Sequence, residues 1–335
     1  MLYITTRNHD DVFTAHHALK RDRCECGGLY VPFTLNQYSS DELIGLKDKS
    51  FGQCIADVLN LFFSARLDGL DVDFCIGKNT SKLVPISHKI VIAENWHNSH
   101  WNVSYVVNKL CARIQDQQIL DGMPSNWVQV AVRIALLFAL YGEMVRSNYI
   151  EPGQVMDVAV TAGDFSAPMA VWYARNMGLP VCNIICGCND DDSLWDLLHN
   201  RQLRTDCATP SNLERLIFAT FGASETERYC SACSSSRTYE LDEEQFEILR
   251  KGMFAAVVSE KRTDSVMRNV HRSASYLLTP NAAIAYGGLQ DYRASTGEGR
   301  IALILTEEGP VCDYAAVAKA TGLSELDIKE KYGAV

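Results

Sequence analysis

The pattern of apolar and polar positions near the middle of the chain predicts a β–α–β unit. The apolar run QVMDVAV at 154–160 has the length of a buried strand, and PVCNIIC at 180–186 predicts a second one. Between them, residues 165–178 show helical periodicity and end at Gly178, a residue type that often follows a helix. We therefore expect parallel strands in an open sheet, with the turn at 161–164 at the edge where such sheets bind ligands.

Other segments extend this α/β pattern. Residues 125–144, SNWVQVAVRIALLFALYGEM, begin with a Ser or Asn cap and are apolar on nearly every side, which is typical of a buried central helix. RIALILT at 300–306 predicts another strand, and two helical segments follow it. The polar run at 230–245, CSACSSSRTYELDEEQ, predicts a linker or surface loop.

The composition restricts the possible partners and the location. A net charge of −10 disfavours nucleic acid and anionic membranes, so neither is expected as a partner. The first residues lack the basic start and apolar core of a signal peptide, and the longest apolar run, at 134–142, is too short to span a bilayer. With twelve cysteines and no export signal, we expect reduced thiols and a cytoplasmic location.

Several stretches, taken together and in order, resemble threonine synthase, a family of fold type II enzymes that use pyridoxal phosphate. YITTR at 3–7 and GGLYVP at 27–32 resemble the start of that family, and SNLERLIF at 211–218 resembles one of its helices. TAGDFSAPMAVWYARNMGLP at 161–180 resembles its glycine-rich phosphate loop and the helix that follows. The resemblance implies a tryptophan synthase β-like fold, in which helices cover both faces of the sheet.

The same resemblance divides the chain into three parts. These are an N-terminal region at 1–90, a remnant of the large α/β domain at 91–306, and a C-terminal helical tail at 307–335. A short connection at 114–125 stands where the family has its small, cofactor-covering domain, which we therefore expect to be largely deleted. The face left by that domain should be covered by a second copy of the chain or by another protein.

The lysine that the resemblance implies is replaced. The family holds pyridoxal phosphate as a Schiff base on a lysine, and the aligned segment HNSHWNVSY at 97–105 places Ser104 at that position. The nearest lysines, Lys89 and Lys109, do not align with it, and serine cannot form the same bond. The other residues that the resemblance places in the ancestral pocket are His97, Asn98, His100, Asn189 and Thr306.

The phosphate loop is altered as well. Gly163 and Phe165 are retained, but Asp164 and Ser166 replace residues of the family's G-N-F-G-N loop. A carboxylate at Asp164 repels a phosphate dianion at short range. We therefore expect no bound cofactor, and in particular no pyridoxal phosphate.

Two functions are consistent with these replacements. In the first, the chain has lost pyridoxal phosphate catalysis and is a pseudoenzyme whose pocket is filled or binds a small amino-acid-like metabolite or a partner. In the second, it is an enzyme of altered chemistry that acts on an amino acid or a phosphorylated hydroxy-amino acid. His97 and His100 are spaced for one helical face, and with Asp164 they form a candidate site for Fe or Zn.

Pairs of cysteines are further candidates for metal binding. Cys230 and Cys233 form C-x-x-C in the polar segment and predict a zinc site, a redox pair or a contact between subunits. The C-x-C pair Cys24 and Cys26 is at most half of a metal site. Glu214 and Arg215 lie in a helix with core spacing, so we expect them to serve packing and ion pairs.

Overall fold

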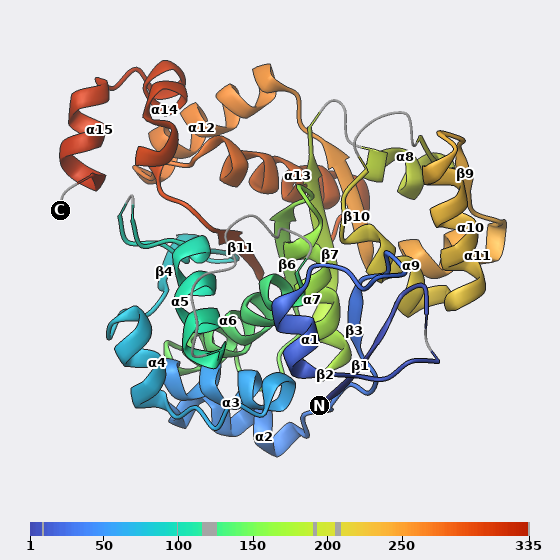
Figure 1. The fold of residues 1–335 in the computed structure, drawn as a ribbon. Helices are drawn as coiled ribbons and strands as arrows, with labels where there is room; N and C mark the ends of the chain where they lie inside the picture. Colours follow the sequence, from blue (N-terminus) through green and yellow to red (C-terminus); the bar gives the residue numbers. More distant parts are fainter. Residues whose placement is uncertain (9, 99, 116–125, 190–192, 205–208, 334–335) are drawn as a thin grey trace.

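A central mixed sheet organises the computed structural model, which describes residues 1–8, 10–98, 100–115, 126–189, 193–204 and 209–333 (Figure 1). Within these residues the sheet has six strands in the order β10-β7-β6-β11-β5-β4. β4 is antiparallel to β5, and the other neighbouring strands are parallel. The α/β class expected from the sequence is therefore confirmed.

The strands of this sheet are short and mostly buried. They are β4 (Lys82–Ser87), β5 (Ile90–Glu94), β6 (Met156–Thr161), β7 (Val181–Cys188), β10 (Met253–Val257) and β11 (Ala302–Thr306). Two smaller antiparallel sheets consist of β1 (Leu2–Thr5), β2 (Phe13–Thr14) and β3 (Tyr30–Pro32), and of β8 (Gln202–Leu203) and β9 (Tyr239–Glu240).

Helices lie on both faces of the central sheet (Figure 1). The helices of the first half are α1 (Ala15–Lys20), α2 (Ser40–Gly45), η1 (Leu46–Asp48), α3 (Phe51–Phe63), α4 (Gly69–Ile76), α5 (Val103–Gln115), α6 (Trp127–Arg146) and α7 (Ser166–Asn176). Those of the second half are α8 (Ser193–Asn200), α9 (Leu213–Phe221), α10 (Ala223–Ser234), α11 (Glu243–Arg250), α12 (Glu260–Ala274), α13 (Pro280–Thr296), η2 (Pro310–Asp313), α14 (Tyr314–Thr321) and α15 (Glu325–Tyr332).

Alternate residues of the strands face two different hydrophobic cores. Along β6, Val158 and Val160 join the larger core with α3, α6 and α7, while Ala159 joins the smaller core with α12 and α13. This alternation follows from the pleat of a strand that is covered on both faces. Gly187 lets α13 approach β7 closely, because a Cβ at that position would overlap the carbonyl of Ile284. Helices packed on both faces of the central sheet therefore hold the positions of its strands.

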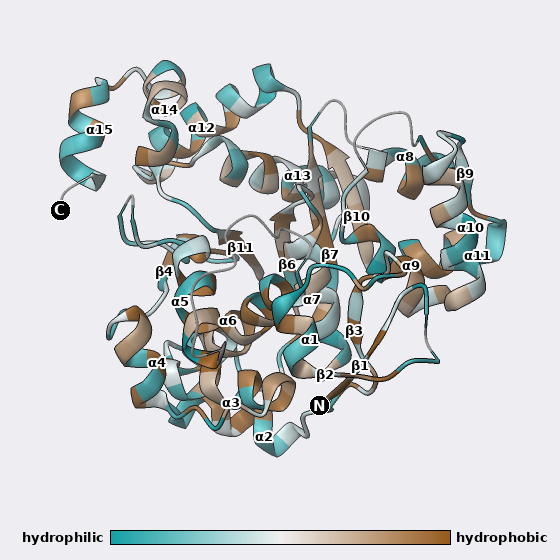
Figure 2. Cartoon of the chain, in the orientation of Figure 1, coloured by the Kyte–Doolittle hydropathy of each residue, from teal (hydrophilic) through white to brown (hydrophobic). Residues whose placement is uncertain are grey.

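α6 forms the centre of the larger core, as its sequence predicts. Asn126 caps its first turn by accepting a hydrogen bond from the backbone N–H of Val128. Within the described chain it is the one helix long and apolar enough to cross a membrane, but 83% of that apolar stretch is buried inside the protein. Figure 2 shows the same helix and the sheet strands as the main concentration of apolar residues.

The prediction of a loop at 230–245 is wrong. The first part of that segment completes α10, and the rest contains β9 and the start of α11. Small and polar residues hide the helical pattern, but Tyr229 is buried in the core and Cys230 and Cys233 pack against it from the same helix. The predicted connection at 114–125 falls mostly outside the described residues, so its replacement of a small domain stays a prediction.

Candidate functional site

A cavity of about 150 Å³ lies at the carboxyl edge of the central sheet, beyond β6 and β11. Because these strands are parallel, the residues at their ends meet at one edge. Ser104 of α5 and Thr306 of β11, two predicted pocket residues, both line it. The full lining is Asn102, Ser104, Thr161, Thr279, Asn281, Ala282, Leu305, Thr306, Glu307 and Glu308.

The hydroxyl of Thr306 is already occupied by a tryptophan. Trp96 lies just after β5 and donates a hydrogen bond of 3.1 Å from its indole Nε1 to Thr306 Oγ1, which in turn donates to the carbonyl of Ala93 at 2.8 Å. Gly309 contacts the same indole so closely that a Cβ there would overlap it. Tyr332 of α15 packs edge-on against it, with ring centroids 6.0 Å apart. A large side chain therefore fills the space beside the end of β11.

Glu307 connects the end of β11 to two helices. Its carboxylate forms a bidentate ion pair with Arg133 of α6, with 2.5 Å from Nε to Oε1 and 2.7 Å from Nη2 to Oε2. Its carbonyl accepts a hydrogen bond of 3.3 Å from the backbone N–H of Val103, the first residue of α5. Two charge-assisted hydrogen bonds in a fork arrangement hold this geometry firmly. The negative charge of Glu307 is thus neutralised within the protein.

The negative charge of Glu308 is compensated much less than that of Glu307. Its Oε1 accepts a hydrogen bond of 2.8 Å from Nδ2 of Asn281, near the start of α13. Over the part of the chain that the structure describes, no lysine or arginine forms an ion pair with Glu308, and none lines the cavity. The cavity is consequently acidic.

The helices that begin at this edge are capped by their own side chains. At α7, Asp164 accepts hydrogen bonds from the backbone N–H of Ser166 at 2.9 Å and from its hydroxyl at 2.6 Å. At α5, Asn102 Oδ1 accepts from the N–H of Tyr105 at 3.0 Å. At α13, Thr279 accepts from the N–H of Ala282 at 3.1 Å. One backbone N–H group in the first turn of each of these helices is therefore already bonded to a side chain of the protein and is not available to a phosphate.

The described residues do not fit pyridoxal phosphate at this edge. Ser104 is exposed on α5 at the position that the resemblance assigns to the lysine. Lys109 lies further along the helix, with its ammonium 5.4 Å from the ring centre of Tyr105. Lys89 precedes β5 and so lies at the opposite edge of the sheet. The cavity offers neither a lysine nor a cationic partner for the phosphate.

The expected site of His97, His100 and Asp164 is not formed. Residues 97 and 100 precede α5 rather than lying on a helical face, and the part of the chain described contains no group of three His, Cys, Asp or Glu placed to hold a metal. His97 packs against Trp101 with ring centroids 4.2 Å apart, and burial, helped by the charge of Lys82, lowers its pKa. His100 is exposed. The spacing of His97 and His100 in the sequence therefore did not predict where their side chains lie.

Two other predicted pocket residues lie away from the cavity lining. Asn98 accepts hydrogen bonds of 2.8 Å from the backbone N–H groups of His100 and Trp101, so it holds a turn before α5. Asn189 is exposed directly after β7. Neither lines the cavity. Five other lining residues were not identified from the sequence: Asn102, Thr161, Thr279, Glu307 and Glu308. Glu307 and Glu308 could have been predicted, because they directly follow the strand expected at 300–306.

Cys230 and Cys233 are partly buried thiols on α10. They pack against the larger core, and burial raises the pKa of Cys230 to about 11. Within the described residues, Cys230 and Cys233 do not belong to a group of three His, Cys, Asp or Glu side chains placed to hold a metal, so their prediction as a zinc site gains no support.

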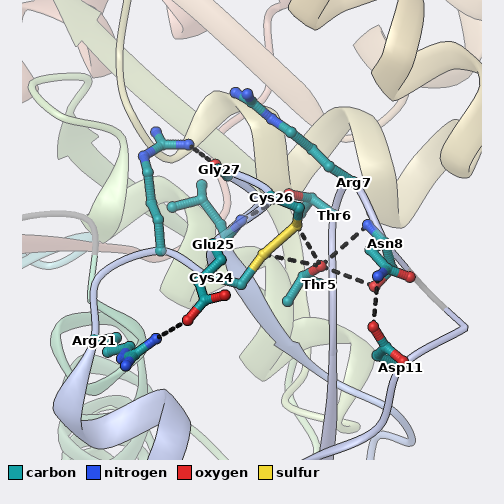
Figure 3. Close-up of a disulfide and its surroundings, with 12 residues drawn as sticks. Thr5, Thr6, Arg7, Asn8, Asp11, Arg21, Cys24, Glu25, Cys26 and Gly27 are labelled. Atoms are coloured by element: carbon teal, nitrogen blue, oxygen red, sulfur yellow. Dashed lines mark hydrogen bonds and ion pairs between the residues drawn. A yellow bond between two sulfur atoms is a disulfide. The ribbon is translucent and has the colours of Figure 1, made fainter.

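The expectation that the cysteines are reduced is wrong for one pair. Cys24 and Cys26 form a disulfide, with their Cα atoms 5.3 Å apart (Figure 3). The turn that contains them is closed by a hydrogen bond of 2.9 Å from the backbone N–H of Gly27 to the carbonyl of Cys24. Figure 3 shows the disulfide beside Thr5 of β1, whose Oγ1 is 3.6 Å from the sulfur of Cys26.

Glu214 joins the N-terminal region to α9, as expected for an ion-pairing residue. Its buried carboxylate accepts hydrogen bonds from the Arg7 guanidinium at 2.9 and 3.0 Å, from Arg23 at 3.1 Å and from the hydroxyl of Thr6 at 2.5 Å. Arg215 is fully buried and donates to the carbonyl of Tyr30 at 3.1 Å. These residues hold β1 and β3 against α9 and are remote in sequence from the cavity residues.

Comparisons with known proteins agree with this fold. Residues 2–79 match the family model described as "Threonine synthase N terminus". The human protein named "Threonine synthase-like 1" is 26% identical over 176 residues, which are 48% of this chain and 24% of that protein. Threonine synthase from Pseudomonas aeruginosa is 25% identical over 226 residues, 61% of this chain and 47% of that protein. The matches thus span about a quarter to a half of the length of these curated relatives.

Solved structures give the same result for the architecture. Threonine synthase from Brucella melitensis with bound pyridoxal phosphate superposes with a TM-score of 0.82 at 18% identity, covering 96% of this chain and 92% of that chain. Threonine synthase from yeast also has a TM-score of 0.82, at 14% identity, covering 100% of this chain and 92% of that chain. At these identities the likeness establishes the fold, and it confirms the fold type II architecture expected from the sequence.

Proposed function

We propose that this threonine synthase-like protein does not carry out catalysis with lysine-bound pyridoxal phosphate. Instead, its remaining cavity binds a small metabolite. The observation that carries the proposal is the hydrogen bond from Trp96 to the hydroxyl of Thr306, a residue that the resemblance places in the family's pocket. Ser104 on the cavity wall supports it, because serine cannot replace the lysine.

The electrostatics of the edge support the same proposal. A phosphate dianion would meet Glu308 without a cationic side chain in the lining. Two unit charges 4 Å apart interact by about 4 kcal/mol at an effective dielectric constant near 20, and here the interaction is repulsive. The N–H groups of Ser166 and Ala282, at the starts of α7 and α13, are bonded to Asp164 and Thr279 and so do not offset that repulsion.

An assay of turnover tests this proposal. The purified chain is incubated with O-phospho-L-homoserine, with and without added pyridoxal phosphate, and release of inorganic phosphate is measured. We expect no release above a blank without protein. Release that saturates with pyridoxal phosphate would overturn the proposal. Elemental analysis for Fe and Zn on the same sample tests the metal-assisted alternative, which requires about one metal ion per chain.

The predicted homo-oligomer or partner complex and the cytoplasmic location remain predictions. The side chains that best support an association are Leu70 and Phe74, which are 74% and 88% exposed one turn apart on α4. Exposed apolar groups of this size often mark an interface. Light scattering of the wild type and of Phe74→Ser tests self-association, because a dimer that uses this face would dissociate in the variant.

A further inference from the structure

The cavity at the carboxyl edge has one negative charge that no cationic side chain of the described residues balances. The carboxylate of Glu307 is paired with Arg133, so these two charges cancel. Glu308 contributes the remaining charge, and among the described residues the side chain that donates a hydrogen bond to it is the neutral amide of Asn281. An acidic, partly enclosed cavity favours a cationic group over an anionic one.

Two neutral hydroxyls also line the wall. Ser104 and Thr161 line the cavity, and neither hydroxyl has a hydrogen bond recorded within the described part of the chain. A hydroxyl can donate or accept, so these two side chains suit either an oxygen or a nitrogen of a ligand. Thr306 and Thr279 are already engaged, by Trp96 and by the first turn of α13.

The size of the cavity limits the ligand further. Its volume of about 150 Å³ is the share of roughly five water molecules in the liquid, at about 30 Å³ each. Pockets for drug-sized ligands hold about 300–1,000 Å³, so this one suits a compound no larger than a small amino acid.

We propose that this cavity binds a small, unphosphorylated primary amine, an amino acid or an amino alcohol, whose ammonium group is held by Glu308. The inference rests on the proposed function, because a lysine-bound cofactor would occupy the same edge of the sheet. Asn281 orients the carboxylate by bonding to its Oε1, which leaves Oε2 for the ligand. A phosphorylated relative of the same amine is rejected, since its phosphate would face the same carboxylate.

Ligand-observed NMR titration of the purified full chain tests this inference with four probes at equal ionic strength. Ethanolamine and L-serine carry the ammonium, whereas D-glycerate lacks it and O-phospho-L-serine adds a phosphate. We expect the two amines to bind and the other two probes to bind at least tenfold more weakly. Glu308→Gln keeps the size of the side chain and its bond to Asn281, and it should weaken both amines at least tenfold. Glu227→Gln is the charge-matched control, because Glu227 is exposed on α10. It should leave the affinity for both amines unchanged.

Three results would overturn the inference: no binding of either amine at 20 mM, equal binding of D-glycerate or O-phospho-L-serine, or an unchanged affinity in Glu308→Gln. These failures differ from failure of the proposed function, which is detected by covalent fixation of pyridoxal phosphate to the protein. If pyridoxal phosphate is not fixed and the amines do not bind, only the present inference is wrong.

Discussion

The indole Nε1 of Trp96 and the hydroxyl of Thr306 are joined by a buried hydrogen bond of 3.1 Å, although the two residues are 210 positions apart in the sequence. Trp96 follows β5 and Thr306 ends β11, and these two strands are hydrogen-bonded neighbours. The bond therefore links the carboxyl ends of adjacent strands at the edge where the cavity lies. It also commits the retained threonine to the interior of the protein.

The first prediction concerns this bond. Thr306→Val should lower the free energy of unfolding by about 1–3 kcal/mol, because the buried indole N–H loses its acceptor. Urea denaturation measures the effect. Thr34→Val is the matched control, since Thr34 is exposed and its hydroxyl makes no hydrogen bond within the described residues, so the change in stability should be less than about 0.5 kcal/mol. Equal effects in the two variants would show that the bond does not contribute.

The second prediction concerns the missing lysine. Ser104→Lys should not restore pyridoxal phosphate binding, because Glu308 still repels the phosphate and Asp164 and Thr279 still bond one N–H group each at the starts of α7 and α13. The measurement is the absorbance of the variant titrated with pyridoxal phosphate and then reduced with borohydride. One equivalent fixed to the variant at micromolar cofactor would show that the lysine was the only missing element.

The third prediction is a dependence of stability on pH through Glu214. Burial raises the pKa of Glu214, but hydrogen bonds from Arg7 and Thr6 and the charges of Arg7 and Arg23 outweigh burial, so the pKa is lowered overall. The unfolded chain then binds more protons than the folded chain, and this stabilisation is lost as the pH falls below the ordinary carboxyl pKa of about 4.3.

Glu214→Gln tests this dependence. At pH 7 the substitution should cost about 1–3 kcal/mol, since Arg7 and Arg23 lose their charged partner but are themselves partly exposed to water. The cost should shrink as the pH is lowered from 5 to 3, as measured by urea denaturation at each pH. Glu227→Gln, at an exposed position, should leave the free energy of unfolding almost unchanged at every pH. A cost that stays constant with pH would contradict the assigned pKa shift.

The fourth prediction concerns the disulfide. Alkylation of the native protein without a reductant should leave Cys24 and Cys26 unlabelled, while the exposed Cys312 is labelled. Peptide mass spectrometry after digestion reads out both sites, and prior treatment with a dithiol reductant should make Cys24 and Cys26 reactive. Labelling of Cys24 at the rate of Cys312 before reduction would show that the pair is reduced.

The sequence predicted the parts of the fold that have strong local patterns. β6, α7 and β7 follow from two short apolar runs around a helical stretch, and α6 follows from its cap and its length. α10 was missed because serines and other small residues dominate its sequence, and its buried positions are few. Local periodicity does not detect a helix that is stabilised mainly by contacts with other elements.

The site was only partly predictable for a different reason. Ser104 and Thr306 could be placed from the aligned motifs, and both line the cavity. The pairing of Trp96 with Thr306 and of Arg133 with Glu307 depends on the order of strands in the sheet, which brings distant residues together. His97 and His100 show the opposite error, since a spacing that suits a helix carries no information when the segment is not helical.

The most direct test of the central claim is an absorbance titration of the purified chain with pyridoxal phosphate, followed by borohydride reduction and intact-mass analysis. The account predicts a spectrum equal to the sum of protein and free cofactor, and an unchanged mass after reduction. A new absorbance band, together with a mass increase of one reduced cofactor on a single lysine, would contradict the claim that this chain has abandoned lysine-bound pyridoxal phosphate.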